Sequence, residues 1–305
     1  MLNSSWNTSY KALVRNAHSR ECPVSDQPLS EIIVDVRSRI FRYMRLTYTK
    51  RTIHDRTRSV FRAMKDLRLS GKIVTEKKMI FNAAMSIISK ELEFLKIQKS
   101  TYVFPSEVGC PHKERAKAAR TVTTADRLEK FKMRLNKYRE NIFDLKALDH
   151  CASALDSYLI SDLEGVSMLY VHSCYPVAVT PESEDSYESD RTCARLARGG
   201  VGAAVLTEDF DNLVLFGCDM VVVEAHRGFF VYTSLKDVMA KLDSVSRKDA
   251  VHKCCLLGTD YNLGLKGIGP VKIQKIDAKK TKELFETCVG AQHIKSDILY
   301  NFFML

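Results

Sequence analysis

The feature that most constrains the fold is a buried strand that ends in two carboxylates. An apolar run from Val201 to Leu206 predicts a buried strand, and Asp209 and Asp211 follow it, one residue apart. Carboxylates at the carboxyl end of such a strand face the crevice where ligands bind, and they repel each other unless a proton or a cation intervenes. Mg²⁺ suits this position because it takes oxygen ligands. The alternative is a surface turn with solvated acids.

The rest of the chain alternates between strand and helix patterns. Strand patterns occur at 31–35, 100–104, 169–171, 176–179, 220–225 and 228–232, and helical patterns at 10–18, 57–95, 113–163, 235–242 and 250–257. This alternation predicts an α/β fold with a mostly parallel sheet flanked by helices. The segment 113–146 is highly charged and poor in apolar residues, so we expect it to form an exposed helical excursion.

The distribution of charge indicates a polyanionic partner. The net charge is +10, and it is uneven: residues 37–68 hold eleven Lys or Arg and two acids, and residues 113–140 hold ten and four. Each run alone is compatible with a solvated helix face. Two dense basic blocks in a chain that also gathers acids favour nucleic acid first and an acidic membrane surface second.

Cysteine usage and hydropathy limit the location of the chain. Nine cysteines occur without CxxC pairs, which is typical of reduced thiols in the cytosol or nucleus. No apolar run approaches the ~18 residues of a membrane span, and the first twenty residues lack a signal-peptide core. We therefore expect a nuclear or cytoplasmic protein that is not secreted and has no membrane partner.

Four acidic positions share the same relation to predicted elements. An acid ends the first strand, a pair lies at a loop-to-helix junction, a pair ends the central strand, and one follows Gly258. These are Asp35, Glu188 with Asp190, Asp209 with Asp211, and Asp260. If they meet at one sheet edge, they could hold two Mg²⁺ ions about 4 Å apart, an arrangement that orients water and stabilises the leaving oxygen in phosphodiester hydrolysis.

A glycine-containing turn near the C-terminal region carries a second signal. Gly267-Ile268-Gly269-Pro270 predicts a tight hairpin before a helix, flanked by Lys266 and Lys272. Glycines let backbone N–H groups approach a phosphate, and a helix N-terminus favours an anion. The alternative is an ordinary turn between helices.

In combination, these motifs resemble the flap endonuclease (5′-nuclease) superfamily. The matching segments are Val34-Asp35, Glu188-x-Asp190-x-x-Cys193-Ala194, Thr207-Glu-Asp-Phe-Asp211 and Gly258-Thr-Asp-Tyr followed by Gly267-Ile-Gly-Pro270. The resemblance implies a PIN-like α/β nuclease domain over residues 1–258, with a basic helical arch inserted at about 105–146. It also implies a helix–two-turn–helix region and tail over 259–305.

The resemblance also implies roles for these residues. Asp35, Glu188, Asp190, Asp209, Asp211 and Asp260 would bind two Mg²⁺ ions, for which Mn²⁺ can substitute. The hairpin of Gly267, Ile268 and Gly269, with its two lysines, would bind duplex DNA and, as in the family, K⁺. Lys113 and Arg120, seven residues apart on one helix face, would steer and polarise the scissile phosphate.

The sequence departs from the family pattern in places. The family has an Asp just after the second strand, whereas this chain reads Phe104-Pro-Ser-Glu107, so either Glu107 substitutes or one ligand is missing. The family's Met-Gly start is absent. Residues 296–303 faintly resemble a sliding-clamp peptide, with a packed terminal helix as the alternative. The compact, divergent form suggests a viral member, acting in an infected cell.

The leading prediction is therefore a Mg²⁺-dependent structure-specific DNA endonuclease or 5′-exonuclease of replication, repair or recombination. It would act on branched or flapped duplex DNA. One alternative is an RNA endonuclease of the viral host-shutoff type, which shares the Thr-x-Asp-x-Asp pattern and a following Gly-Cys-Asp such as Gly217-Cys-Asp219. Another is a DNA-binding protein with a weakened active site.

Overall fold

The structure is a computed structural model, and its described residues fall into two compact units. The described residues are 20–26, 29–48, 50–97, 99–105, 113–162, 166, 178–179, 188–262 and 264–290. Unit 1 comprises Met1–Asp35, Glu91–Lys113 and Val177–Leu305, and unit 2 comprises Val36–Lys90 and Glu114–Pro176. The two units are described separately below.

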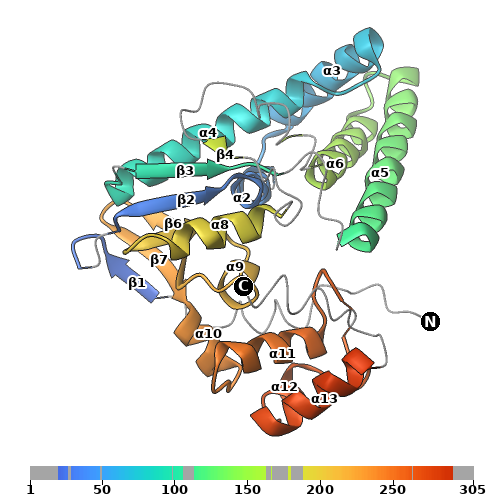
Figure 1. The fold of residues 1–305 in the computed structure, drawn as a ribbon. Helices are drawn as coiled ribbons and strands as arrows, with labels where there is room; N and C mark the ends of the chain where they lie inside the picture. Colours follow the sequence, from blue (N-terminus) through green and yellow to red (C-terminus); the bar gives the residue numbers. More distant parts are fainter. Residues whose placement is uncertain are drawn as a thin grey trace. The chain divides into compact units, whose positions relative to one another are not determined.

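Unit 1 is built on a twisted sheet (Figure 1). Among the described residues the sheet has seven strands in the order β1-β7-β6-β5-β2-β3-β4. Their bounds are Arg20–Pro23 for β1, Glu31–Asp35 for β2, Lys99–Val103 for β3, Ala178–Val179 for β4, Ala203–Leu206 for β5, Met220–His226 for β6 and Phe229–Ser234 for β7. The strands from β4 to β6 in this order pair in parallel.

The predicted mostly parallel α/β sheet is confirmed. Only the edge formed by β6, β7 and β1 is antiparallel, and β1 was not predicted. The interior of β2 (residues 32–34) and the last three residues of β5 (residues 204–206) are buried and apolar, as expected for strands covered on both faces. Val34 pairs with Leu206, so these neighbouring strands end side by side and bring the residues that follow them to one sheet edge.

The helices of unit 1 pack around a continuous apolar core. They are α8 at Ser189–Arg198, α9 at Asp211–Val214, α10 at Leu235–Lys241, α11 at Arg247–Leu257, α12 at Pro270–Ile273 and α13 at Ala278–Gly290. The core joins β5 through Val205 to α11 through Leu256 and to α13 through Phe285. His252 of α11 also stacks on Phe285, with ring centroids 4.0 Å apart. The helices that follow β7 are thereby tied to the sheet.

Unit 2 is helical. Its helices are α2 at Val36–Tyr48, α3 at Ile53–Ser70, α5 at Glu114–Glu140, α6 at Leu145–Ser161, and most of α4, which runs from Thr75 to Leu95 and ends in unit 1. Among the described helices, none is both long and apolar enough to cross a membrane.

Two helices predicted in unit 2 are shorter in the structure than expected, and one of them is less exposed. The helix expected over 57–95 breaks at Gly71, whose φ of +69° ends α3 and is readily adopted by glycine. The excursion predicted over 113–146 ends at Glu140, and Asp144 caps the separate helix α6. It is also not fully exposed, because Phe131, Leu135 and Tyr138 of α5 are buried; their helical spacing forms an apolar stripe within the charged sequence.

Three predicted elements lie outside the described residues. They are the helix near 10–18, the strand at 169–171 and the clamp-like segment at 296–303.

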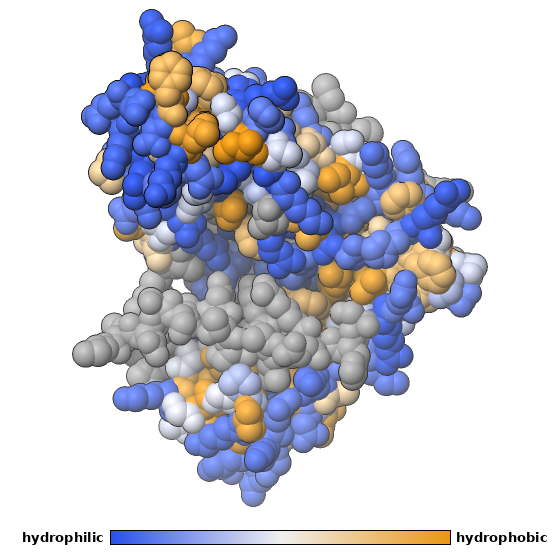
Figure 2. All heavy atoms as spheres, turned by 180° about the vertical axis from the view of Figure 1, so that it is seen from behind, coloured by the Kyte–Doolittle hydropathy of each residue, from blue (hydrophilic) through white to orange (hydrophobic). Residues whose placement is uncertain are grey.

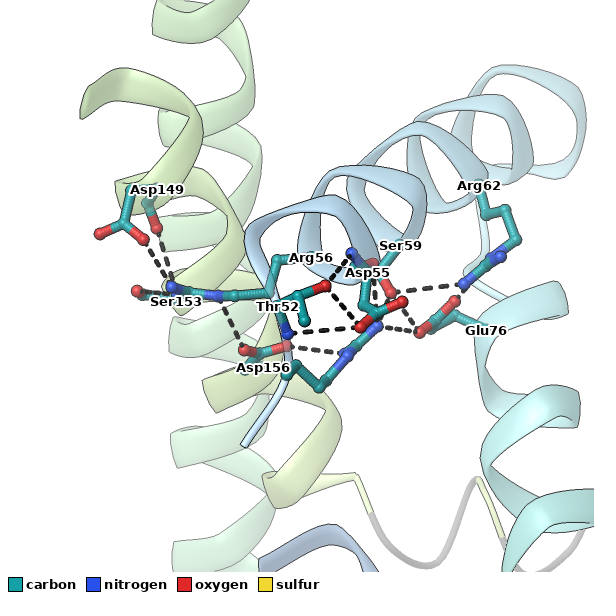
Figure 3. A network of polar contacts seen from close by, with 10 residues as sticks. Thr52, Asp55, Arg56, Ser59, Arg62, Glu76, Asp149, Ser153 and Asp156 are labelled. Carbon is teal, nitrogen blue, oxygen red and sulfur yellow. Dashed lines mark hydrogen bonds and ion pairs between the residues drawn. The ribbon is translucent and has the colours of Figure 1, made fainter. Parts of the chain in front are cut away.

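A buried polar network joins α3 to α4 and α6 within unit 2 (Figure 3). The carboxylate of Glu76, at the start of α4, accepts from Arg51 at 3.0 Å, from Ser59 at 2.5 Å and from Arg62 at 2.8 Å. Arg51 also pairs with Asp156 of α6 at 3.2 Å. Because Glu76 and Ser59 are buried, these contacts replace the water that the charges would otherwise need.

We expect Glu76→Gln to lower the free energy of unfolding by about 1.5–3 kcal/mol, because it removes the negative charge from the hydrogen bonds that the buried carboxylate accepts from the partly buried Arg51 and Arg62. Urea denaturation followed by circular dichroism would measure the change. Glu129→Gln is the matched control, since Glu129 pairs with Lys132 on the exposed side of α5, where an ion pair contributes at most about 1 kcal/mol. Equal losses in the two variants would contradict a structural role for the network.

Candidate active site

The carboxyl ends of β2 and β5 place the first carboxylates. Asp35 is the last residue of β2 and is buried. The hydroxyl of Thr207, just beyond β5, donates to Asp35 Oδ2 at 2.7 Å, and its oxygen accepts from the backbone N–H of Asp209 at 2.9 Å. The two strand ends are therefore joined by one hydroxyl, which holds Asp35 and the Asp209 loop in fixed relation.

The loop after β5 turns directly into helix α9. The backbone N–H of Asp211 donates to Asp209 Oδ1 at 3.2 Å, so one predicted ligand helps to begin the helix that carries the other. Asn212 Nδ2 lies 3.3 Å from Asp190 Oδ1 and 3.3 Å from the backbone oxygen of Asp209. This amide links the β5 loop to the acidic start of α8.

Helix α8 presents its two acids at its N-terminus. Glu188 occupies the N-cap position and Asp190 lies in the first turn, where the helix dipole favours negative charge. Both side chains are buried. Glu188 makes no capping hydrogen bond to its own helix, so its carboxylate is available to a group from elsewhere in the chain.

That group is the ammonium of Lys113. Its Nζ lies 2.8 Å from Glu188 Oε1, 3.6 Å from Asp190 Oδ2 and 4.6 Å from the centroid of the Tyr261 ring. Lys113 is only 7 % exposed. A buried cation at these distances receives both charge pairing and the attraction of an aromatic face.

The pKa of Lys113 reflects the surrounding negative charge. Burial alone would lower the pKa of this ammonium, but the negative charges of Glu188, Asp190, Asp260 and Asp211 outweigh burial and raise it above its ordinary value. Lys113 is therefore protonated at neutral pH. Carboxylates from the start of α8, the start of α9 and the turn after α11 thus all act on this one ammonium.

The pKa of Asp190 is also changed by the neighbouring carboxylates. Burial raises its pKa well above the ordinary value, and the charges of Asp209, Asp35 and Glu188 raise it further, whereas Lys113 opposes the change. The pKa of an acid among other carboxylates rises because its ionised form is repelled by their negative charges. The site therefore has more negative charge than one ammonium neutralises.

Asp260 is held by a compact polar turn after α11. Thr259 Oγ1 lies 2.7 Å from Asn262 Oδ1 and accepts from the N–H of Tyr261 at 3.1 Å, and Asn262 Nδ2 donates to the Cys255 oxygen at 2.7 Å. The turn thus closes back onto the end of α11. It places Asp260 and the Tyr261 ring near Lys113.

This turn packs too tightly for any added side-chain atom. A Cβ at Gly264 would lie 2.4 Å from the Leu257 oxygen, whereas a Cβ at Gly269 would meet nothing within 4 Å. We expect Gly264→Ala to cost about 1–3 kcal/mol of stability and Gly269→Ala less than about 0.5 kcal/mol. Thermal denaturation of both variants measures this difference, and a fully stable Gly264→Ala protein would contradict it.

The predicted hairpin is open to an approaching ligand. Gly267 adopts φ +84°, and the surroundings of Gly267 and Gly269 leave space on their Cα side. Ile268 is partly buried, Lys266 and Lys272 are exposed, and Lys272 Nζ lies 3.2 Å from the Gly267 oxygen. Helix α12 begins at Pro270. The segment is a turn that leads into a helix, with backbone amides and two cations at the surface.

Two predicted residues are not part of this cluster as described. Glu107 lies outside the described residues, so its substitution for the missing family Asp stays a prediction. Arg120 is a partly buried residue of α5 in unit 2, and its role on the phosphate also stays a prediction. Lys113 directly precedes α5, which begins at Glu114.

Sequence reasoning gave no role to three residues that organise the site, namely Thr207, Asn212 and Tyr261, although Thr207 and Tyr261 stand in the segments that resemble the superfamily. A Thr two residues before an Asp is the pattern of a hydroxyl-capped turn, and this signal could have singled out Thr207. No local signal identifies Asn212 or Tyr261, because their partners are 22 and 148 residues away in the chain.

The chemistry of the donors fits hard divalent cations. Carboxylate oxygens with excess negative charge are what Mg²⁺ and Mn²⁺ bind. Among the described side chains, no group of three or more His, Cys, Asp or Glu has the arrangement of a ready-made metal site. The ammonium of Lys113 provides the positive charge between Glu188 and Asp190, so metal entry would require it to move.

Comparisons with known proteins agree with this architecture. Residues 181–260 match the family model XPG I-region. Flap endonuclease 1 of Methanococcus aeolicus is 32 % identical over 113 residues, which is 36 % of this chain and 34 % of the relative. Flap endonuclease 1 of Candida tropicalis is 35 % identical over 100 residues, covering 32 % and 26 %.

A solved structure extends the similarity in fold to most of the chain. The catalytic core of Rad2 in complex with a DNA substrate has a TM-score of 0.50 and 17 % identity, covering 96 % of this chain and 84 % of that one. The sequence matches span between about a quarter and a third of the length of these two curated relatives. The family match includes Glu188, Asp190, Asp209, Asp211 and Asp260, so the part of the chain that holds most of the predicted metal ligands is similar to the XPG I-region and to flap endonucleases.

Proposed function

We propose that this protein is a Mg²⁺-dependent nuclease that hydrolyses phosphodiester bonds in branched or flapped duplex DNA. The observation that carries the proposal is the pairing of Lys113 with the buried carboxylates of Glu188 and Asp190 at 2.8 and 3.6 Å. The negative charges of four further acids, from β2, the β5 loop, α9 and the turn after α11, act on this buried group. Buried acids that repel one another destabilise a fold, and a bound divalent metal ion would offset this repulsion.

The names of the relatives support the class of substrate. Flap endonucleases are among the matching proteins, and one solved structure of similar fold is the catalytic core of Rad2 in complex with a DNA substrate. The net charge of +10 suits a polyanion. The turn from Lys266 to Lys272 has two exposed lysines and accessible backbone at its glycines, where a phosphate of duplex DNA could bind. We also propose that this turn binds K⁺.

The residues of the chain have distinct tasks in the proposed reaction. Asp35, Glu188, Asp190, Asp209, Asp211 and Asp260 would hold two divalent ions, which when bound orient water and neutralise charge on the phosphate. Thr207 keeps Asp35 and the Asp209 loop in register, and Asn212 orients Asp190. Lys113, displaced from Glu188 by metal, would provide a positive charge for the phosphate.

Cleavage assays with end-labelled substrates test this proposal. A 5′-flap DNA, a plain DNA duplex and a single-stranded RNA would be incubated with the protein in Mg²⁺ or Mn²⁺. We expect cleavage of the flap DNA near its junction, with little cleavage of plain duplex. Cleavage of RNA alone would support the host-shutoff type of nuclease instead. Binding to flap DNA without cleavage would indicate a DNA-binding protein with a weakened site.

Metal affinity is expected to increase with pH. The raised pKa of Asp190 means that it retains a proton at a pH where an ordinary Asp has lost it, and metal must displace that proton. The stability of the metal-free protein should change in the opposite direction. Because the raised pKa lets the folded state bind more protons than the unfolded state, the free energy of unfolding falls as pH rises. Calorimetry in two buffers of different ionisation enthalpy would detect proton release, and identical heats would contradict it.

A further inference from the structure

The turn between α5 and α6 carries a concentrated apolar surface that the proposed nuclease chemistry does not use. Ile142, Phe143 and Leu145 are 57 %, 86 % and 72 % exposed, within four consecutive residues. Single exposed apolar residues are common on protein surfaces, whereas adjacent ones indicate a site of interaction. In Figure 2, apolar side chains lie among hydrophilic ones at the upper left of the view, at the ends of these helices.

A basic pocket lies beside this turn. It has a volume of about 120 Å³ and is lined by Arg134, Lys137, Asp144, Lys146, Ala147 and His150. The acid in this set is already engaged, because Asp144 Oδ1 accepts from the N–H groups of residues 146 and 147 at 2.9 and 3.0 Å. The remaining polar side chains of the pocket can all carry positive charge.

The residues around the turn also carry an excess of positive charge. Residues 130–150 hold six Lys or Arg and three Asp or Glu. Besides Asp144, which caps α6, Asp149 pairs with Arg56 of α3 at 2.5 Å. Two of the three acids thus have internal partners, and the surface beside Ile142, Phe143 and Leu145 attracts anions.

We propose that Ile142, Phe143, Leu145 and the basic pocket beside them form a docking site for an acidic, apolar peptide segment of a partner protein. Two of the three exposed apolar residues are aliphatic and offer no ring for a base to stack on, whereas single-stranded nucleic acid binds through aromatic platforms. Aliphatic surface is instead covered by apolar side chains of another protein. Carboxylates flanking those side chains would meet Lys137 and Lys146.

Fluorescence anisotropy with the full-length protein tests this proposal. The probe is a synthetic 16-residue peptide that combines Glu with Leu and Phe, compared with a peptide in which Lys replaces each Glu, and with a labelled oligo(dT). We expect the acidic peptide to bind with a Kd in the micromolar range and the basic one not to bind. Phe143→Ser/Leu145→Ser and Lys137→Glu/Lys146→Glu should each weaken acidic-peptide binding at least five-fold.

Matched variants control for general effects. Ile87→Ser/Val122→Ser removes exposed apolar side chains elsewhere in unit 2, and Lys78→Glu/Lys90→Glu makes the same charge change on exposed positions of α4. Both should leave peptide binding unchanged. Peptide binding that is absent, or unaffected by the turn and pocket variants, would overturn the proposal. Loss of oligo(dT) binding without loss of peptide binding would overturn it in favour of a nucleic-acid site.

Discussion

Replacing Asp209 and Asp211 together by Asn is expected to reduce cleavage of 5′-flap DNA by about 1,000-fold or more. Losing a single charge-stabilising group in an active site typically costs about 100- to 1,000-fold in rate, and this change removes two of the proposed ligands from the β5 loop. Because Asn has the same shape as Asp, the Asp211 position in the first turn of α9 can keep its packing.

The same variant should separate catalysis from folding. Removing two carboxylates relieves repulsion on Asp190, whose pKa is raised by Asp209, so the metal-free variant should melt at the same temperature as the natural protein or higher. Stabilisation by Mg²⁺ or Mn²⁺ should be lost. Calorimetry would measure the number of bound ions, with two expected in the natural protein and fewer in the variant.

Glu208→Gln is the matched control for this experiment, because Glu208 lies in the same loop between Thr207 and Asp209 and is not among the proposed ligands. It should retain most of the cleavage. Normal cleavage by the double Asn variant would rule out the carboxylate-based mechanism. Equal losses in both variants would mean that loop structure, and not charge, determines the rate.

Replacing Lys113 by Met is expected to destabilise the metal-free protein by about 3–5 kcal/mol, because it leaves the buried carboxylate of Glu188 without its cation. For a chain of 305 residues, that corresponds to a fall in Tm of roughly 5–8 °C, given an unfolding entropy of about 2.1 cal/mol/K per residue. The defining result is rescue: added Mg²⁺ should restore most of the lost stability, since a divalent ion replaces the ammonium among the carboxylates.

Lys253→Met provides the comparison. Lys253 is also fully buried, but its Nζ donates to the backbone oxygens of Leu242 and Asp243 at 3.0 and 2.6 Å. We expect a similar loss of stability without rescue by Mg²⁺, because among the described residues this ammonium pairs with one carboxylate, that of Asp249 at 3.8 Å, and not with a cluster. Melting curves in EDTA and in Mg²⁺ measure both effects. Absence of rescue for Lys113→Met would show that the ammonium and the metal do not share a site.

Much of unit 1 could be predicted because its signals are local. Apolar runs mark β2 and β5, and the acids that follow them lie at the sheet edge as expected. In a parallel sheet, the direction of each strand determines which edge its last residue reaches. The positions of Asp35, Asp209 and Asp211 after their strands therefore follow from the strand pattern in the sequence, whereas the order that places β2 beside β5 comes from the structure.

Helix boundaries in unit 2 were less predictable. The helical spacing of 57–95 continues through Gly71, and the charge pattern of 113–146 conceals the buried stripe of Phe131, Leu135 and Tyr138. Whether a glycine breaks a helix, or a sparse stripe becomes core, depends on what packs against it.

The pairing of charges was decided only by tertiary structure. Lys113 was predicted to act on the phosphate, and in the structure it lies against Glu188, 75 residues away in sequence. Arg51, in the loop before α3, meets Glu76 of α4 and Asp156 of α6. Composition records how many charges a chain has, and spacing indicates which faces they share. Which cation neutralises which acid depends on the packing of distant elements, because charge interactions weaken with distance and strengthen with burial.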